Sequence, residues 1–230
     1  ITASDLETTL VTSMEVENAE GEGVIAVDAR RLLKLKDTSE QPLTFNINTE
    51  SLSVDILSES GKFTKVEQKG EDYPKHQEID DAQKTEITLK SEALLSAINK
   101  TIFATAEDDL RPVMNGILFA FSPDYLTAVA SDAHKMVRYR RTDVNAEQEA
   151  SFILPQKPAQ MLKNLLPNDE TDVKITFDQQ NAIMEFANFT QVCRLVEGKY
   201  PNYEAVIPKD NPYKMTVDRL DLHNKLKMVS

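Results

Sequence analysis

The sequence repeats itself at an interval of about 127 residues, and this repeat constrains the fold more than any other feature. Ala3-Ser4-Asp5 recurs as Ala130-Ser131-Asp132, 127 positions later. Two further landmarks recur in the same order after 126 and 127 positions: Phe63-Thr64 as Phe189-Thr190, and Tyr73-Pro74 as Tyr200-Pro201. Three landmarks at one spacing indicate a repeat protein, in which each unit is one structural module.

A shorter period lies inside this repeat. A strand-like run leads into a helix-like run four times, and the strand-like runs end at positions 27, 89, 155 and 217. The predicted helices occupy residues 28–36, 90–100, 156–166 and 218–227. Each unit is therefore two half-units with one helix each. We expect domains at residues 1–82, 83–209 and 210–230, with only the middle one complete and the chain cut at both ends.

Segments around the predicted helices alternate apolar and polar residues and are rich in β-branched and aromatic side chains. A period of two is typical of half-buried strands. The clearest runs are residues 44–47, 53–57, 173–177 and 182–186. The predicted fold class is α+β, built from repeated β-α-β-β-β half-units, with two helices packed on one face of an antiparallel sheet in each domain.

The chain carries a formal net charge of −12, yet its predicted helices are basic. They hold eleven Lys or Arg residues and four Asp or Glu residues. In helix 156–166 the spacing puts two kinds of residue on opposite sides: Ala159, Leu162, Leu165 and Leu166 against Lys157, Gln160, Lys163 and Asn164. Such a polar face is either simply solvated or offers cations and amides to an anionic partner. If the repeats curve, these faces line a concave basic surface.

Residues for catalysis are sparse. The chain has six glycines and lacks a phosphate-binding loop and the common hydrolase motifs. His76, His134 and His223 have no metal-ligand spacing, so we expect no metal and no cofactor. The single cysteine, Cys193, is expected to be buried and unreactive. Because one cysteine cannot form an internal disulfide, we expect the chain in a reducing cytoplasm. No apolar run reaches the length of a membrane span.

Three segments carry a specific combination of residues. Residues 110–119 read Leu-Arg-Pro-Val-Met-Asn-Gly-Ile-Leu-Phe, and residues 126–136 read Leu-Thr-Ala-Val-Ala-Ser-Asp-Ala-His-Lys-Met. Residues 195–203 read Leu-Val-Glu-Gly-Lys-Tyr-Pro-Asn-Tyr, and Val206-Ile-Pro208 follows. In this order the segments resemble the bacterial DNA sliding clamp, the beta subunit of DNA polymerase III, and the resemblance extends along the whole chain.

The resemblance implies a processivity factor, a non-catalytic subunit of the replicative DNA polymerase holoenzyme. Two subunits of three similar domains would close into a ring around double-stranded DNA and slide on it without sequence specificity. Helices line the hole of such a ring. The resemblance therefore directs these side chains toward DNA: Arg30, Arg31, Lys34, Lys90, Lys100, Lys157, Lys163 and Lys225.

The same resemblance implies a hydrophobic pocket between domains 2 and 3. There the replicative polymerase, the clamp loader and repair polymerases would bind through short linear peptides. The domain 2 side of the pocket would be Arg111, Met114, Ser131, His134, Lys135, Met136, Pro201 and Val206. Methionine side chains repack easily around varied partners, although ordinary core filling also explains Met114 and Met136.

Two other functions stay open on the residues alone. Asp108 and Asp109 are adjacent carboxylates that could hold Mg²⁺ in a nuclease or nucleotidyl transferase, although such a pair is more often a solvated loop. The chain could also be a protein-interaction scaffold without a DNA function. Substituting either aspartate separates the first alternative from a clamp, and reversing the helix charges separates the second.

Overall fold

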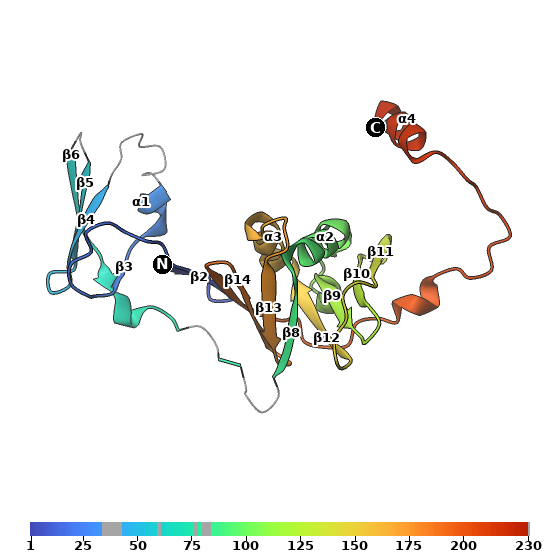
Figure 1. Cartoon of the computed structure of the whole chain (residues 1–230), viewed down its shortest axis with the longest axis horizontal. Coiled ribbons are helices and arrows are strands. Elements are labelled where there is room, and N and C mark those ends of the chain that lie inside the picture. Colours follow the sequence, from blue (N-terminus) through green and yellow to red (C-terminus); the bar gives the residue numbers. More distant parts are fainter. Residues whose placement is uncertain (34–42, 59–60, 76–77, 80–83, 230) are drawn as a thin grey trace. The chain divides into compact units, whose positions relative to one another are not determined.

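The structure, a computed structural model, describes residues 1–33, 43–58, 61–75, 78–79 and 84–229. It forms two compact units, residues 1–197 and residues 198–230 (Figure 1). None of the helices in the described part of the chain has the length and the apolar character needed to cross a bilayer.

Two half-units with the same order of elements follow one another in the first compact unit. The first consists of β8 (Thr85–Lys90), α2 (Ser91–Thr101), β9 (Gly116–Phe121), β10 (Leu126–Ser131) and β11 (Met136–Arg141). The second consists of β12 (Ala150–Pro155), α3 (Gln156–Leu165), β13 (Asp172–Phe177), β14 (Asn181–Phe186) and β15 (Phe189–Arg194). Short 3-10 helices, η3 (Ile102–Ala104) and η4 (Pro112–Met114), connect α2 to β9. The predicted β-α-β-β-β order and the α+β class are confirmed.

The two half-units exchange their first strands. Strand β8 pairs antiparallel with β13 of the second half-unit, and β12 pairs antiparallel with β9 of the first. The result is a six-stranded sheet of order β1-β2-β15-β14-β13-β8 and a four-stranded sheet of order β11-β10-β9-β12. Both helices pack against antiparallel strands as predicted, but the division of those strands between two sheets was not anticipated. The exchange splits the strands between two sheets, and residue patterns along a strand do not reveal such distant pairings.

Helices α2 and α3 lie side by side over the strands, and their inner faces form the core with both sheets (Figure 1). Leu94 of α2 and Leu162 of α3 are fully buried. Phe152 stacks on Phe119 with ring centroids 5.4 Å apart and contacts Phe177 at 4.8 Å. Burying each such side chain contributes roughly 1.5–3 kcal/mol before conformational entropy is subtracted, so this core holds the exchanged strands together.

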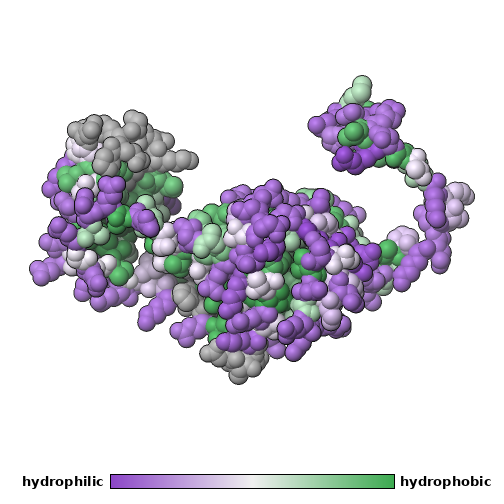
Figure 2. All heavy atoms as spheres, viewed as in Figure 1, coloured by the Kyte–Doolittle hydropathy of each residue, from purple (hydrophilic) through white to green (hydrophobic). Residues whose placement is uncertain are grey.

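The N-terminal part contains the β-α-β-β-β order once more, preceded by two further strands. Its elements are β1 (Thr2–Ser4), β2 (Thr8–Thr12), β3 (Ile25–Ala26), α1 (Ala29–Leu33), β4 (Thr44–Asn48), β5 (Ser53–Ser58), β6 (Gly61–Val66), β7 (Gln68–Lys69) and η2 (Gly70–Asp72). Strands β4, β5 and β6 form a three-stranded sheet, and β3 pairs with β7. Figure 2 shows hydrophobic side chains on the surface of the β4–β6 segment, where Phe45, Ile47 and Phe63 are exposed.

The second compact unit contains η5 (Tyr203–Val206) and α4 (Arg219–Val229). The predicted helix is confirmed, but the strand predicted at residues 215–217 is not formed. Met215 is 80% exposed there. A strand forms when a neighbour accepts and donates its main-chain hydrogen bonds, and no described strand pairs with this segment.

Candidate functional site

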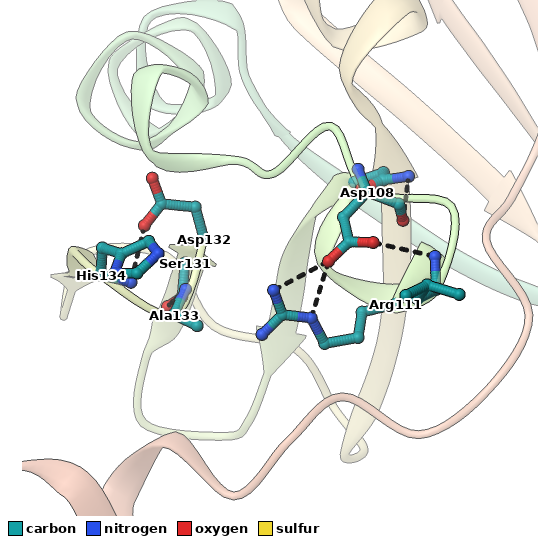
Figure 3. Close-up of polar contacts among 8 residues, drawn as sticks. Asp108, Arg111, Ser131, Asp132, Ala133 and His134 are labelled. Atoms are coloured by element: carbon teal, nitrogen blue, oxygen red, sulfur yellow. Dashed lines mark hydrogen bonds and ion pairs between the residues drawn. The ribbon is translucent and has the colours of Figure 1, made fainter.

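The recurring Ala-Ser-Asp landmark is the hairpin turn between β10 and β11 (Figure 3). Asp132 Oδ1 accepts hydrogen bonds from the main-chain N–H groups of His134 at 2.9 Å and Lys135 at 2.8 Å. Ser131 Oγ accepts one from the N–H of Ala133 at 3.2 Å. Ala133 has a φ of 73°, in the left-handed region. Serine and aspartate therefore recur here because their oxygens satisfy a tight turn.

The turn carries a fixed negative charge. The Lys135 ammonium hydrogen-bonds Asp132 Oδ2, and together with the N–H groups of Lys135 and His134 it lowers the pKa of the Asp132 carboxyl well below its usual range. Lys135 is thus turned back onto its own turn. His134 is exposed and contributes its main chain to the turn, which leaves its ring available.

Arg111 is held in a second cluster, in the loop before η4 (Figure 3). Its Nε donates to Asp108 Oδ2 at 2.8 Å, while Asp108 Oδ1 accepts from the N–H of Leu110 at 2.9 Å. The Leu110 N–H and the Arg111 guanidinium hold the pKa of the Asp108 carboxyl below its ordinary value. Asp108 therefore orders its own loop.

The Asn-Gly part of the motif fixes this loop to the sheet. Asn115 Oδ1 accepts from the N–H of Asp108 at 2.9 Å, and its Nδ2 donates to the Asp108 carbonyl at 3.1 Å. A Cβ on Gly116 would come within 2.5 Å of the Leu154 carbonyl oxygen of β12, so only glycine fits there. No group of three His, Cys, Asp or Glu side chains among the described residues could hold a metal ion.

The predicted pocket residues are brought together only in part. Ser131, His134, Lys135 and Met136 share one hairpin turn, and Met136 begins β11. Met114 lies in η4 and is only 6% exposed, so most of its side chain fills core space. Pro201 and Val206 belong to the second compact unit, and Val206 is 69% exposed.

The predicted amphipathic face of α3 is confirmed. Ala159 and Leu162 are fully buried. The side chains on the opposite side are all exposed: Lys157, Gln160, Lys163 and Asn164. Gln160 Nε2 donates to Asn164 Oδ1 at 3.4 Å along this face.

Several of the predicted DNA-facing cations are already paired. Lys90 is the last residue of β8 rather than a helical residue, and its Nζ lies 2.8 Å from Asp172 on the neighbouring strand. Lys225 pairs within α4 with Asp221 at 2.8 Å, and Lys157 pairs with Asp5. The Lys100 ammonium lies 5.7 Å from the ring centre of Tyr139.

The remaining cations of that group differ in how they are held. Lys163 and Arg30 are exposed, and no ion pair links either to another described residue. Arg31 lies in α1, and Lys34 falls outside the described residues. Lys163 is thus the clearest candidate on α3 for binding a phosphate.

The six-stranded sheet crosses the boundary between two repeats. Strand β2 pairs with β15, with Thr9 opposite Val192 and Thr8 opposite Cys193. Burial raises the pKa of the Cys193 thiol to about 12, as expected for an unreactive cysteine. The Asp5–Lys157 pair joins the β1–β2 turn to α3 and lowers the pKa of the Asp5 carboxyl. We call this β2–β15 junction the seam.

Strand β11 is the equivalent of β2, one repeat later in the sequence. Thr9 in β2 and Met136 in β11 are 127 positions apart. Strand β11 pairs with β10 on one side, and no described strand pairs with its other side. The chain therefore presents a strand edge of the kind that forms the seam.

Comparison with known proteins agrees with this architecture. The family described as DNA polymerase III beta subunit, central domain, matches residues 88–202. The chain belongs to this family, that of the bacterial sliding clamps. It is 28% identical over 220 residues, 95% of its length, to the beta sliding clamp of Pseudomonas putida, and covers 59% of that protein. It is 32% identical to the beta sliding clamp of Borreliella burgdorferi over 145 residues, which are 63% of this chain and 37% of that protein.

A solved structure matches as well. The sliding clamp of Pseudomonas aeruginosa bound to griselimycin matches with a TM-score of 0.83 and 27% identity, over 92% of this chain and 57% of that one. The chain thus spans about three fifths of the length of these relatives.

Sequence reasoning missed the structural roles of three aspartates in these sites. Asp132 and Asp5 hold the two copies of the turn, and Asp108 holds Arg111. The Ala-Ser-Asp landmark contained the signal for the first two, since serine followed by aspartate between two strands is a turn signature. For Asp108 and Arg111 the signal was their spacing of three residues across a loop.

Proposed function

We propose that this chain is part of a ring-shaped dimer that encircles duplex DNA in the cytoplasm, slides without sequence specificity and tethers the replicative polymerase. Its domains are residues 1–82, 83–209 and 210–230. Binding of this kind uses diffuse contacts to phosphate, and a tethered polymerase stays near the template through its high effective concentration. No catalytic step is assigned to this chain.

The observation that carries the proposal is the seam. Two successive repeats share one sheet through β2 and β15. Strand β11 offers the equivalent edge to a following repeat. A head-to-tail junction that recurs with a fixed rotation either closes into a ring or continues as a filament. Family membership favours the ring.

The helix surface supports DNA as the encircled partner. α3 presents Lys157, Gln160, Lys163 and Asn164 to solvent and has no acidic residue. Lys100 is exposed near the end of the neighbouring α2. In a chain of net charge −12, cations and amides on adjacent helices suit a polyanion that is held loosely.

We also propose that clients bind at the turn of residues 131–136, with Arg111, Met114, Pro201 and Val206 completing the pocket. Half-buried Met136 begins β11 beside the exposed His134 ring. Asp132 keeps the turn rigid, so the pocket wall is ordered before a peptide arrives. The clamp loader and repair polymerases would use the same pocket.

The test reverses Lys100 and Lys163, two exposed helix lysines that form no ion pair with another described residue. The K100E/K163E variant of the full-length protein is loaded onto closed circular DNA, and the retained fraction is measured against salt concentration. We expect weaker retention and a log–log salt slope lower by about one per lysine.

The matched control reverses two lysines that are not on the helices. Lys62 lies in β6 and Lys174 lies in β13, and each is about half exposed. The K62E/K174E variant changes the net charge equally, so we expect its retention to stay near that of the wild type. Equal loss in both variants, or no loss in either, would overturn the proposed DNA contact.

A separate measurement addresses the client pocket. Met136→Ala shortens a half-buried side chain at the start of β11. We expect it to lower the processivity of the replicative polymerase on primed circular DNA while retention of the clamp itself is unchanged. Processivity equal to that of the wild type would contradict the assignment of Met136.

A further inference from the structure

A small cavity lies at the seam, within the first compact unit. Its volume is about 80 Å³. The turn between β1 and β2 contributes Ser4, Leu6 and Thr9, and β15 contributes Val192 and Cys193. This volume is far below the roughly 300–1,000 Å³ of typical small-molecule sites, so it suits one side chain rather than a whole ligand.

The turn at this cavity is a copy of the turn at residues 131–136. Asp5 Oδ1 accepts from the N–H groups of Glu7 at 3.1 Å and Thr8 at 2.7 Å. Ser4 Oγ accepts from the N–H of Leu6 at 3.1 Å. Each of these bonds has its counterpart 127 positions later, at Ser131 and Asp132.

The cavity-lining residues keep the same spacing. Ser4, Leu6 and Thr9 stand 127 positions before Ser131, Ala133 and Met136. Pro74 also lines the cavity, and its counterpart is Pro201, which is in the proposed client pocket. Three of these four counterparts, Ser131, Met136 and Pro201, are positions that the proposed function assigns to client binding.

Leu6 is conformationally unusual at the rim of this cavity. It is 76% exposed and has a φ of 77°, in the left-handed region that bulky residues rarely adopt. Core packing does not explain this leucine, because its side chain is exposed. The turn does not require it either, because glycine or asparagine adopts a left-handed conformation more easily. Strain that the surrounding structure maintains is a common mark of a binding site.

Charges around the cavity indicate which peptide would fit. Lys75 and Arg194 line it, against a single acid, Glu7. All three side chains are exposed, and Arg194 also lies 3.5 Å from Glu197. Among the side chains that line the cavity the cations outnumber the acids by one, and on a chain of net charge −12 this favours an acidic partner.

We infer that the seam cavity is a second peptide site, which takes one leucine-sized side chain from an acidic linear peptide. This inference rests on the proposed client role of the 131–136 turn. The site is the upstream copy of that pocket, with Leu6 and Thr9 at the positions of Ala133 and Met136. A client could then be held at two points of one subunit, and two weak contacts on one partner multiply in affinity.

The experiment uses the protein labelled with ¹³C at leucine and methionine methyl groups and the probe acetyl-Asp-Leu-amide. Leu6 reports the seam cavity and Met136 reports the proposed client pocket. We expect saturable shifts of the Leu6 methyl resonances, and none with acetyl-Asp-Gly-amide, which lacks the apolar side chain. Absent Leu6 shifts, or equal shifts with both probes, would overturn the site.

Two variants test the cavity and its charge. Thr9→Leu fills the cavity and should abolish the Leu6 shifts. Lys75→Glu changes only an exposed rim and should reverse the preference between acetyl-Asp-Leu-amide and acetyl-Lys-Leu-amide, by about two- to fivefold for one exposed ion pair. The control Lys62→Glu should leave the preference unchanged.

The two sites fail independently. A Leu6 response with a silent Met136 contradicts the client role of the 131–136 turn but supports the seam cavity. A Met136 response with a silent Leu6 has the opposite meaning. An Asp preference that survives Lys75→Glu would refute the charge selection proposed here.

Discussion

Two copies of one hairpin turn occur in this chain, and they differ in what their outer strands meet. The turn of Asp5 leads into β2, which is paired with β15, and Asp5 itself pairs with Lys157 of α3. The turn of Asp132 leads into β11, which no described strand pairs with on its outer side, and Asp132 pairs with Lys135 of its own turn. The same local structure is thus seen once inside a junction and once at an edge.

This difference separates what local residues build from what the neighbouring repeat supplies. The turn is built by residues within four positions of each other, so it forms in both places without help from a neighbour. The junction depends on a strand that the next repeat supplies. Local sequence therefore fixes the shape of the edge, and the neighbouring repeat determines whether that edge is filled.

The largest effect should come from proline in the two equivalent strands, Val11→Pro in β2 and Arg138→Pro in β11. Val11 lies in a strand with neighbours on both sides, opposite Thr190 of β15, whereas Arg138 lies in an edge strand. We expect Val11→Pro to cost about 3 kcal/mol or more and Arg138→Pro to cost less, because proline is tolerated best at edges. Urea unfolding measures the difference.

The seam can be followed directly through Cys193. Its buried thiol lies opposite Thr8, so labelling by a thiol reagent requires the seam to open. We expect Val11→Pro to accelerate labelling and Arg138→Pro to leave it unchanged. If the full-length protein fills the β11 edge, Arg138→Pro should become as damaging there as Val11→Pro. Equal and small costs in both proteins would contradict a recurring junction.

A smaller effect is expected from glycine at the two left-handed positions. Leu6 has a φ of 77° and Ala133 a φ of 73°. A left-handed conformation costs an L residue about 1–2 kcal/mol. Glycine avoids this cost but loses more backbone entropy on folding, so only part of the gain remains. Leu6→Gly and Ala133→Gly should therefore each raise the free energy of unfolding by about 0.5–1 kcal/mol. A loss of stability in either would mean that its side chain makes a contact that outweighs the strain.

The smallest effect concerns pH and the Asp5–Lys157 pair. Lys157 lowers the pKa of Asp5 below its ordinary 3.8, so the pair stabilises the fold above about pH 4, and this contribution is lost as the pH falls through the lowered value. The pKa of Lys157 is raised above its ordinary 10.5, so its contribution is complete below that pH and is lost above it.

Asp5→Asn and Asp132→Asn compare the two turns under these conditions. Both should lower the urea midpoint slightly at pH 7, and the effect should shrink as the pH falls below about 4 toward the lowered pKa of each carboxyl. Only Asp5→Asn should also speed the labelling of Cys193, because only Asp5 bridges to α3. Similar labelling in the two variants would show that the ion pair does not hold the seam.

Local periodicity predicted much of this fold. The stripe of Ala159 and Leu162 gave α3 its buried face, and the β-α-β-β-β order follows from alternation and turn residues. The strand predicted at residues 215–217 is absent because apolar alternation alone does not make a strand. A strand also needs a neighbouring strand that pairs with its main-chain N–H and C=O groups. The exchange of β8 and β12 was hidden for the same reason, since pairing is a property of distant segments.

Site prediction from sequence was limited because ion pairs between distant residues cannot be read from the sequence. The resemblance directed Lys157 and Lys90 toward DNA, and neither it nor the charge count could show their ion pairs with Asp5 and Asp172. Each acid belongs to a segment remote in sequence, so no spacing rule connects them. The exposure of Lys163 could be predicted because it depends only on the face of one helix.

Whether the protein encircles DNA can be decided from the topology of its binding. The full-length protein is loaded onto nicked circular DNA, and the bound fraction is measured before and after a single cut that linearises the circle. A ring that encircles DNA without gripping it should stay on the circle and slide off the cut ends, leaving little bound at physiological salt. Equal retention on circular and linear DNA would contradict the ring and indicate ordinary surface binding.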